Sequence, residues 1–90
     1  MGLGAFGLEA PAPNPFRDRL EVAYALDAPG PVSVVVFDAL GRRVAVVEEG
    51  ERAAGRHRAT FEAGALPAGA YLVRLEAGGA VDVARVVRVR

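Results

Sequence analysis

The fold is decided by one stretch near the middle of the chain, which joins a run of valines to a turn: Val32-Ser33-Val34-Val35-Val36-Phe37-Asp38-Ala39-Leu40-Gly41. The run is apolar on both sides, which predicts a strand in the centre of a sheet, with Val32, Val34 and Val36 facing inward. The residues that follow predict a tight hairpin, because Asp38 can cap its own turn and Gly41 can adopt a positive φ. The stretch is therefore typical of antiparallel β structure.

Alternating sequences flank this hairpin on both sides. Apolar residues at every second position predict three further strands, with inward sets Leu20, Val22, Tyr24 and Leu26, then His57, Ala59 and Phe61, then Tyr71, Val73 and Leu75. Val44 and Val47 both favour the inward face, which breaks the alternation and predicts a bulge or a strand end between them. The polar stretch from Glu48 to Gly55 is expected to be a loop.

Turn signals recur along the rest of the chain. Leu66-Pro67-Ala68-Gly69 predicts a tight turn, and the position of Tyr71 just after it is typical of the tyrosine corner of immunoglobulin-like domains. Gly78-Gly79 predicts a two-residue hairpin that leads into a last strand over about residues 80–89. With no sustained helical period, this pattern predicts an all-β fold, an immunoglobulin-like antiparallel sandwich of about seven strands.

Length and composition predict a single domain. The chain has 90 residues, and residues 1–12, rich in Gly, Ala and Pro, are expected to be a linker or the start of an expressed fragment, with residues 13–90 as the folded domain. Within the linker, Phe6 and Leu8 alternate in a way that suits a short edge strand. The opening residues lack the basic start and long apolar run of a signal peptide.

The charge balance argues against an electrostatic binder of nucleic acid. Eleven basic and eleven acidic residues give a net charge of zero, which by itself predicts no strong long-range steering. Every basic residue is an arginine, so chemistry based on lysine is excluded. Cysteine is absent as well, which excludes disulfides and thiolate metal sites.

Few side chains are suited to catalysis. The sequence has one serine, one threonine and one histidine; Ser33 lies in a valine strand, and His57 is expected to be a rim residue that packs over Phe61. We expect no catalytic residue, cofactor or metal site, and no pocket that unites Ser33 or His57 with carboxylates. Glu48, Glu49 and Glu51 are expected to be solvated in their loop rather than to hold calcium or to act as an acid–base pair.

Arginines gather in two places, in the middle of the chain and near its end. They are Arg42, Arg43, Arg52, Arg56 and Arg58, followed by Arg85, Arg88 and Arg90. One interpretation is a docking face for an anionic partner. The other is protection of strand edges and pairing with nearby glutamates, which composition alone favours.

Four landmarks in order carry a family resemblance: Pro13-Asn14-Pro15-Phe16, Asp38-Ala39-Leu40-Gly41-Arg42, Leu66-Pro67-Ala68-Gly69-Ala70-Tyr71-Leu72 and Arg85-Val86-Val87-Arg88-Val89-Arg90. From about Pro11 to Arg90 the chain resembles the C-terminal sorting domain of proteins exported by the type IX secretion system, the Por secretion tail. That family is related to the immunoglobulin-like module of the flagellar hook-capping protein.

The resemblance implies a non-enzymatic address carried by a longer cargo protein. It implies export through the periplasm to the cell surface or beyond, recognition of the folded domain by an outer-membrane translocon, and removal by a sortase-like surface protease. Composition and hydropathy, rather than the resemblance, predict no nucleic acid partner and no membrane span.

The resemblance also assigns residues. The terminal strand becomes the candidate for translocon recognition, through Val86, Val87, Arg88, Val89 and Arg90. The remaining motif positions are interpreted as scaffold: Pro13, Asn14, Pro15, Phe16, Asp38, Gly41, Arg42, Gly55, Leu66, Gly69, Tyr71 and Val73.

An alternative of a different class stays open at this point. The domain can also be read as an accessory immunoglobulin-like spacer or carbohydrate-binding module of a multidomain secreted protein. A row of solvent-facing aromatic rings would favour that alternative, because sugars stack on such rings.

Overall fold

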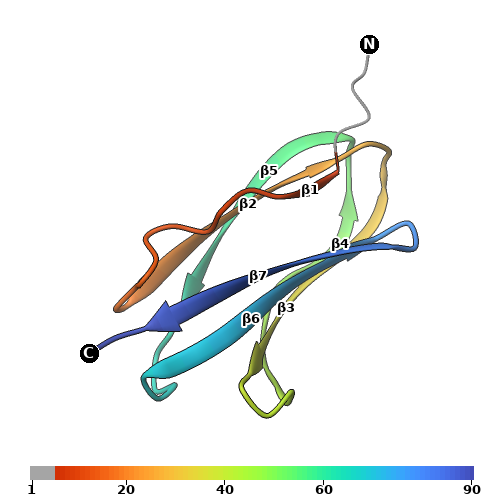
Figure 1. The fold of residues 1–90 in the computed structure, drawn as a ribbon. Helices are drawn as coiled ribbons and strands as arrows, with labels where there is room; N and C mark the ends of the chain where they lie inside the picture. Colours follow the sequence, from red (N-terminus) through yellow and green to blue (C-terminus); the bar gives the residue numbers. More distant parts are fainter. Residues whose placement is uncertain (1–5) are drawn as a thin grey trace.

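The computed structural model describes residues 6–90, so the part of the predicted linker before Phe6 lies outside the described residues. Figure 1 shows two antiparallel sheets that face each other, and the predicted all-β sandwich of about seven strands is confirmed. The strands are β1 (Gly7–Leu8), β2 (Arg19–Leu26), β3 (Gly30–Asp38), β4 (Arg43–Arg52), β5 (Gly55–Glu62), β6 (Gly69–Ala77) and β7 (Ala80–Arg88). No helix long and apolar enough to cross a membrane occurs among these residues.

The two sheets differ in size. One has three strands in the order β1-β2-β5, and the other has four in the order β4-β3-β6-β7. The valine strand β3 is central in the larger sheet, as the sequence predicted, because its backbone is paired on both sides, with β4 and with β6. Strand β7 lies at one edge of this sheet and faces the side where β1 runs beside β2 (Figure 1).

The core lies between the sheets and follows the predicted alternation. Its buried members come from both sheets and from the segment before β2: Phe16, Leu20, Val22, Tyr24, Leu26, Val32, Val34, Val36, Phe61, Ala63, Tyr71, Val73, Leu75 and Val86. The ring of Phe16 meets that of Phe61 edge-on, with centroids 6.3 Å apart. Phe16 therefore closes one end of the core.

Strand β4 is longer and more irregular than the sequence predicted. Its pairing with β3 shifts register twice, and Val44 and Val47 are the unpaired residues at the shifts, which confirms the predicted bulge. The prediction of a loop from Glu48 to Gly55 is wrong, because β4 continues to Arg52. The start of β3 supplies backbone partners for these polar residues, and Arg52 bonds the carboxylate of Glu48 at 2.8 Å.

The segment before β2 crosses from one sheet to the other. Gly7 and Leu8 pair with the end of β2, and Ala12 bridges Glu21 near its beginning. The alternation of Phe6 and Leu8 predicted a short edge strand, and β1 is that strand. The boundary between linker and domain at residues 12 and 13 stays a prediction.

Candidate functional site

The landmark Pro13-Asn14-Pro15-Phe16 lies against the end of β7. The Asn14 side chain donates from Nδ2 to the Arg85 carbonyl at 3.1 Å and accepts from the Val87 amide at 3.0 Å, as the backbone of a neighbouring strand would. The backbone of Phe16 continues the pattern, because its amide bonds the Val87 carbonyl and its carbonyl accepts from the Val89 amide, at 2.9 and 2.8 Å. Asn14 and Phe16 thus cover the free edge of β7 and fix where its last residues lie.

Arg88 joins three segments at this end of the molecule. Its side chain is only 18% exposed, and its guanidinium donates to the backbone carbonyls of Arg17, at 2.6 Å, and of Leu66. Asp18 lies 3.8 Å away as a weak ionic partner. Arg88 therefore holds the entry segment and the turn before β6 together, whereas the sequence suggested a solvated arginine that protects an edge.

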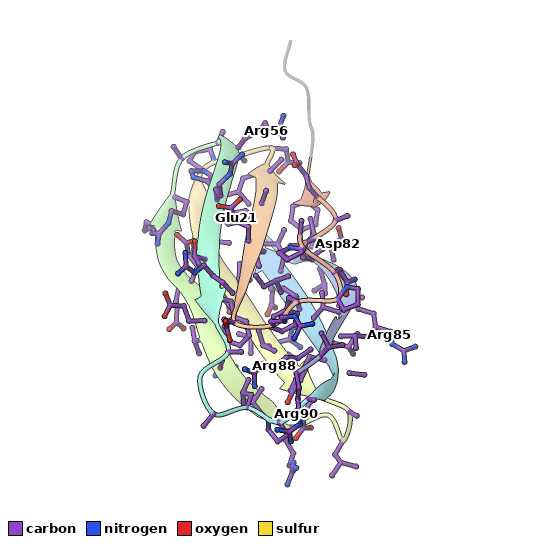
Figure 2. The ribbon with its side chains drawn as sticks, turned by 90° about the vertical axis from the view of Figure 1, so that its left-hand side faces the viewer. Glu21, Arg56, Asp82, Arg85, Arg88 and Arg90 are labelled. Atoms are coloured by element: carbon purple, nitrogen blue, oxygen red, sulfur yellow. The ribbon has the colours of Figure 1, made fainter. Side chains whose placement is uncertain are left out.

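The residues proposed for recognition differ in exposure. Val86 is fully buried and belongs to the core, whereas Val87, Arg88 and Val89 are half-buried and Arg90 is exposed. Arg17 donates a hydrogen bond to the backbone oxygen of Arg90, so that this residue is also held in place. Exposed Arg85 projects from β7 on the outer side of the sheet (Figure 2).

The opposite half of β7 is held by an acidic side chain. Asp82 accepts hydrogen bonds from the Leu8 amide at 2.8 Å and from the Val83 amide at 3.0 Å, so it ties β1 to the β7 edge. Gly7 permits this approach, because a Cβ there would lie 2.9 Å from the Asp82 carboxylate and its φ is +145°. No pattern in the sequence predicts this contact, which joins residues 74 positions apart.

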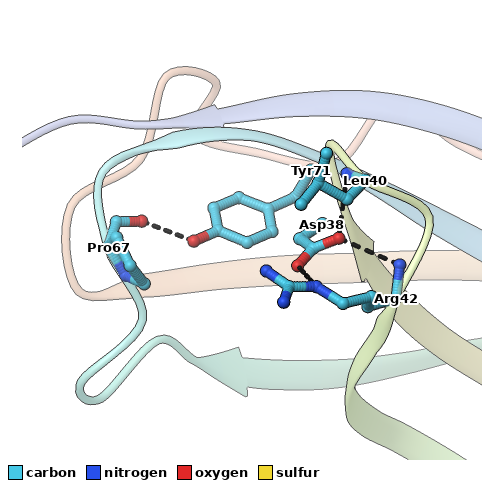
Figure 3. Close-up of polar contacts among 5 residues, drawn as sticks. All are labelled: Asp38, Leu40, Arg42, Pro67 and Tyr71. Atoms are coloured by element: carbon cyan, nitrogen blue, oxygen red, sulfur yellow. Dashed lines mark hydrogen bonds and ion pairs between the residues drawn. The ribbon is translucent and has the colours of Figure 1, made fainter.

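The second and third landmarks meet at the β3–β4 hairpin (Figure 3). Asp38 accepts from the amides of Leu40 and Arg42 at 3.0 and 2.9 Å and pairs with the Arg42 side chain at 2.8 Å. Gly41 has a φ of +81°, and its amide bonds the Asp38 carbonyl at 2.9 Å, which confirms the predicted turn. Hydrogen bonds, above all from the Arg42 amide, lower the pKa of Asp38 below its ordinary value.

The predicted tyrosine corner is present beside this hairpin. The Tyr71 hydroxyl donates to the Pro67 carbonyl at 2.5 Å (Figure 3). Asp38, Arg42, Leu66, Gly69 and Tyr71 line a shared shallow depression of about 320 Å³. Two landmarks far apart in the sequence are thus one structural unit, while Gly55 lies at the start of β5 and Val73 in the core.

The stability of the folded protein at acidic pH depends on the ionised Asp38 in the β3–β4 turn. Because its pKa is lowered in the folded state, its contribution is full above the ordinary value of 3.8 and is lost as the pH falls through the folded-state pKa. We expect Asp38→Asn to lower the melting temperature at pH 7, and to differ little from the parent near about pH 2. Thermal unfolding followed by circular dichroism measures the melting temperatures of the variant and the parent at each pH. A difference between them that persists at the acidic pH would contradict the role given to the Asp38 carboxylate. Asp27→Asn, at an exposed carboxylate beyond β2, provides the control.

His57 does not occupy the predicted place. Its ring stacks on Tyr24, with centroids 5.3 Å apart, and its Nε2 lies 2.7 Å from the Ala53 carbonyl. The prediction that it packs over Phe61 is wrong, because the β2–β5 register sets His57 directly opposite Tyr24. Burial, followed by the nearby Glu48 carboxylate, raises the pKa of Tyr24.

One expectation about pockets was also wrong. Ser33 shares an open depression of about 380 Å³ with Glu49 and Glu76, because both carboxylates lie opposite it in the neighbouring strands. The described residues that line this depression include no histidine to activate the hydroxyl. Within residues 6–90, no three histidine, cysteine or acidic side chains lie close enough together to hold a metal ion.

Charge is separated along the sandwich although the net charge is zero. We call the end where β7 finishes the basic end, because its seven arginines outnumber its three carboxylates. The arginines are Arg17, Arg19, Arg42, Arg43, Arg85, Arg88 and Arg90, and the carboxylates are Asp18, Asp38 and Glu62. At the other end, which we call the acidic end, seven carboxylates outnumber two arginines. The carboxylates are Glu9, Asp27, Glu48, Glu49, Glu51, Glu76 and Asp82, and the arginines are Arg52 and Arg56. Figure 2 shows Arg88 and Arg90 far from Arg56. The inference of weak steering from net charge alone therefore needs correction, since it overlooked this distribution.

Comparison with protein families identifies the class of protein that this fold and strand end define. The family model of the secretion system C-terminal sorting domain matches residues 12–89, and the chain belongs to that family. The domain is therefore a sorting signal for type IX secretion, attached to a cargo and directing export to the cell surface or the extracellular space. The family is not known for enzymatic activity. Comparisons with curated proteins and with solved structures gave no match.

Proposed function

We propose that the outer-membrane translocon of the type IX system reads this domain in its folded form and binds it at the basic end. The cargo and its signal would pass through the periplasm first. A sortase-like surface protease would then cut in the segment before Pro13. The domain itself would take part in no catalytic step.

The observation that carries this proposal is the fixed position of the end of β7. Asn14 and Phe16 hold the backbone of residues 85–89 through four hydrogen bonds, and Arg88 adds a bond to Arg17 in the same segment and one to the turn before β6. A surface that is held in one conformation costs less conformational entropy to bind than a free tail. A folded signal is thus better suited to recognition by shape than an extended peptide.

Exposure divides the terminal residues into two roles. Val86 is buried and Arg88 is largely covered, so we assign them to the scaffold that shapes the surface. Arg90, with the half-buried Val87 and Val89, is the part that a translocon can touch. We add Arg85, the first residue of the fourth landmark, to the candidate recognition residues, because it is exposed on the same strand.

Charge supports an acidic partner surface. The basic end carries a surplus of four positive charges, and complementary charges on the translocon would orient the domain before contact. Salt weakens such attraction, so capture should be weaker at high ionic strength.

Reversal of two exposed charges tests this proposal in cells. A neutral reporter is given an export signal and fused upstream of this chain, in a bacterium that has the secretion system. We expect the double variant Arg85→Glu, Arg90→Glu to lower export by about tenfold, a loss of about 1.4 kcal/mol of binding. The readout is the ratio of reporter in the medium and on the surface to reporter in the periplasm.

Arg58→Glu is the matched control, because Arg58 is also exposed but lies on β5 in the other sheet. Its export should equal that of the parent. Equal export by the double variant, with the fold intact by circular dichroism, would remove the basic end from the recognition surface.

The alternative of a carbohydrate-binding module lacks the feature that would favour it. Among the described residues, the aromatic rings are buried or half-buried: Phe6, Phe16, Tyr24, Phe37, Phe61 and Tyr71. The partly exposed ring of Phe37 is itself covered by Arg74, whose guanidinium lies 4.9 Å from the ring centroid. No row of solvent-facing rings is therefore available within residues 6–90 for sugar stacking.

A further inference from the structure

The outer face of the four-stranded sheet is apolar although it faces solvent. Val46, Leu72, Val81 and Val83 are 48, 42, 54 and 53% exposed, and the strand register places all four on this face. Val35 lies between them and is itself buried. We call these five residues the outer apolar face. Exposed antiparallel sheets usually carry polar residues on the solvent side, so this face is unusual.

The smaller sheet does not share this property. The outward positions of β2 and β5 are polar, charged or small: Arg19, Glu21, Ala23, Ala25, Arg56, Arg58, Thr60 and Glu62. Only one of the two sheets therefore has an apolar outer surface within the described residues. A contiguous exposed apolar patch of this kind marks a site of interaction with another macromolecule.

Charges frame the outer apolar face on two sides. Toward the basic end, Leu72 shares its row across the strands with Arg43 and Arg85, which are exposed. Toward the acidic end, Val81 shares its row with Glu49 and Glu76, which are also exposed, and Val46, Val35 and Val83 lie in the middle row between these two. Arg74 lies within the middle row, but its guanidinium packs on a ring and lies 3.6 Å from Glu76, so its charge is partly compensated.

We propose that a second copy of this chain covers the outer apolar face. A two-fold axis in the plane of the interface and perpendicular to the strands reverses the strand direction. It sets the arginine row of each copy over the glutamate row of the other, with Arg43 opposite Glu49 of the second copy. The middle rows meet at the axis, where Val46, Val35 and Val83 pack on their own copies and the Arg74 side chains also meet. Such an isologous, self-complementary contact is the commonest form of homodimer.

Other arrangements of two copies fit less well. An axis parallel to the strands would set the arginine rows against each other, and like charges in contact are costly. Sheets that pack face to face keep their strands within about 30° of each other, which both axes permit, so the charges decide between them. Two Arg43–Glu49 pairs outweigh the single contact between Arg74 side chains, whose charge Glu76 partly compensates, so the charges favour the perpendicular axis.

The available area predicts a reversible dimer. Four strands about 4.8 Å apart and about 30 Å long cover about 600 Å² in each copy. Two copies would bury about 1,200 Å², which is at the lower end of specific interfaces. In this orientation the two basic ends point to opposite poles of the dimer, so Arg90 stays free in both copies, whereas Arg85, in the arginine row, is covered and is available to the translocon only in the monomer.

Oligomeric state in solution tests the dimer independently of export. Sedimentation equilibrium on this chain, from about 1 μM to about 1 mM, should show a monomer–dimer equilibrium. Arg43→Glu alone or Glu49→Arg alone should raise the dissociation constant by about tenfold, because each sets like charges opposite each other twice. The double variant Arg43→Glu, Glu49→Arg should return it to within about threefold of the parent, since it restores both pairs.

Arg58→Glu, on the other sheet, should leave the dissociation constant unchanged, and circular dichroism should confirm that each variant is folded. A chain that stays monomeric up to about 1 mM overturns the proposal, as does a dimer that Arg43→Glu does not weaken. The proposal would also be overturned if the secretion machinery captured a monomeric chain and Val46→Glu abolished that capture. The outer apolar face would then be assigned to the secretion machinery.

Discussion

Replacement of Phe16 by alanine is expected to destabilise the domain by about 3–5 kcal/mol, since it removes a buried aromatic ring and leaves a cavity. The ring is 1% exposed and meets Phe61 at the end of the core. Domains of this kind are stable by only about 5–15 kcal/mol, so this variant would lose a large share of its stability. Equilibrium unfolding in urea measures the difference.

Phe37→Ala is the matched control, because it deletes the same atoms from a half-buried position on the outer side of β3. Phe37→Ala is expected to lower the free energy of unfolding by about 1 kcal/mol, because it leaves an open surface rather than a cavity. Both variants should be compared at low protein concentration, where association does not contribute. Equal losses of unfolding free energy in the two variants would mean that Phe16 does not close the core.

The effect of Phe16 reaches beyond its ring. Its backbone also pairs with Val87 and Val89, so a displaced Phe16 would release the end of β7. We therefore expect Phe16→Ala to impair export as well, although the residue is buried and touches no partner. Core packing and the recognition surface are in this way joined at one residue.

The sequence predicts the strands well because each is a local pattern. Alternation identifies the inward sets of β2, β5 and β6, and the turn at Asp38 follows from the chemistry of an aspartate and a glycine alone. The tyrosine corner is equally local, since Tyr71 bonds a carbonyl four residues upstream. Such features need no knowledge of the rest of the chain.

What the sequence did not predict depends on contacts between distant residues. Strand β4 continues through Glu48, Glu49 and Glu51 because the start of β3 provides partners, and polarity alone suggested a loop. Arg88 is covered because the turn before β6 brings the carbonyl of Leu66 to it, across 22 positions. Neither contact leaves a periodic signal in the sequence.

The same limit applies to the surface. A net charge of zero conceals a basic and an acidic end, because the sum does not depend on where each residue lies. The outer apolar face is concealed for the same reason, as Val46, Leu72 and Val83 come from three strands that only the register brings together. Surfaces assembled across strands need the structure before they can be recognised.

Val86→Asp is expected to abolish export, because it places a carboxylate in the core. Val86 is fully buried, and an unpaired charge there costs several kcal/mol, enough to unfold a domain of ordinary stability. A deletion of Val86 to Arg90 would also stop export, but it removes core and contact residues together. The substitution leaves Arg90 and the length of the chain unchanged, so it isolates the requirement for a folded signal.

Val83→Asp is the matched control for this experiment, with the same chemical change three positions earlier on β7 at a side chain that is 53% exposed. It should stay folded by circular dichroism and be exported like the parent, because its carboxylate lies in water in the monomer and export does not require the proposed dimer. If Val86→Asp were unfolded and yet exported normally, the translocon would be reading the terminal residues as a linear peptide. The contrast between two valines on one strand thus decides whether shape or sequence carries the signal.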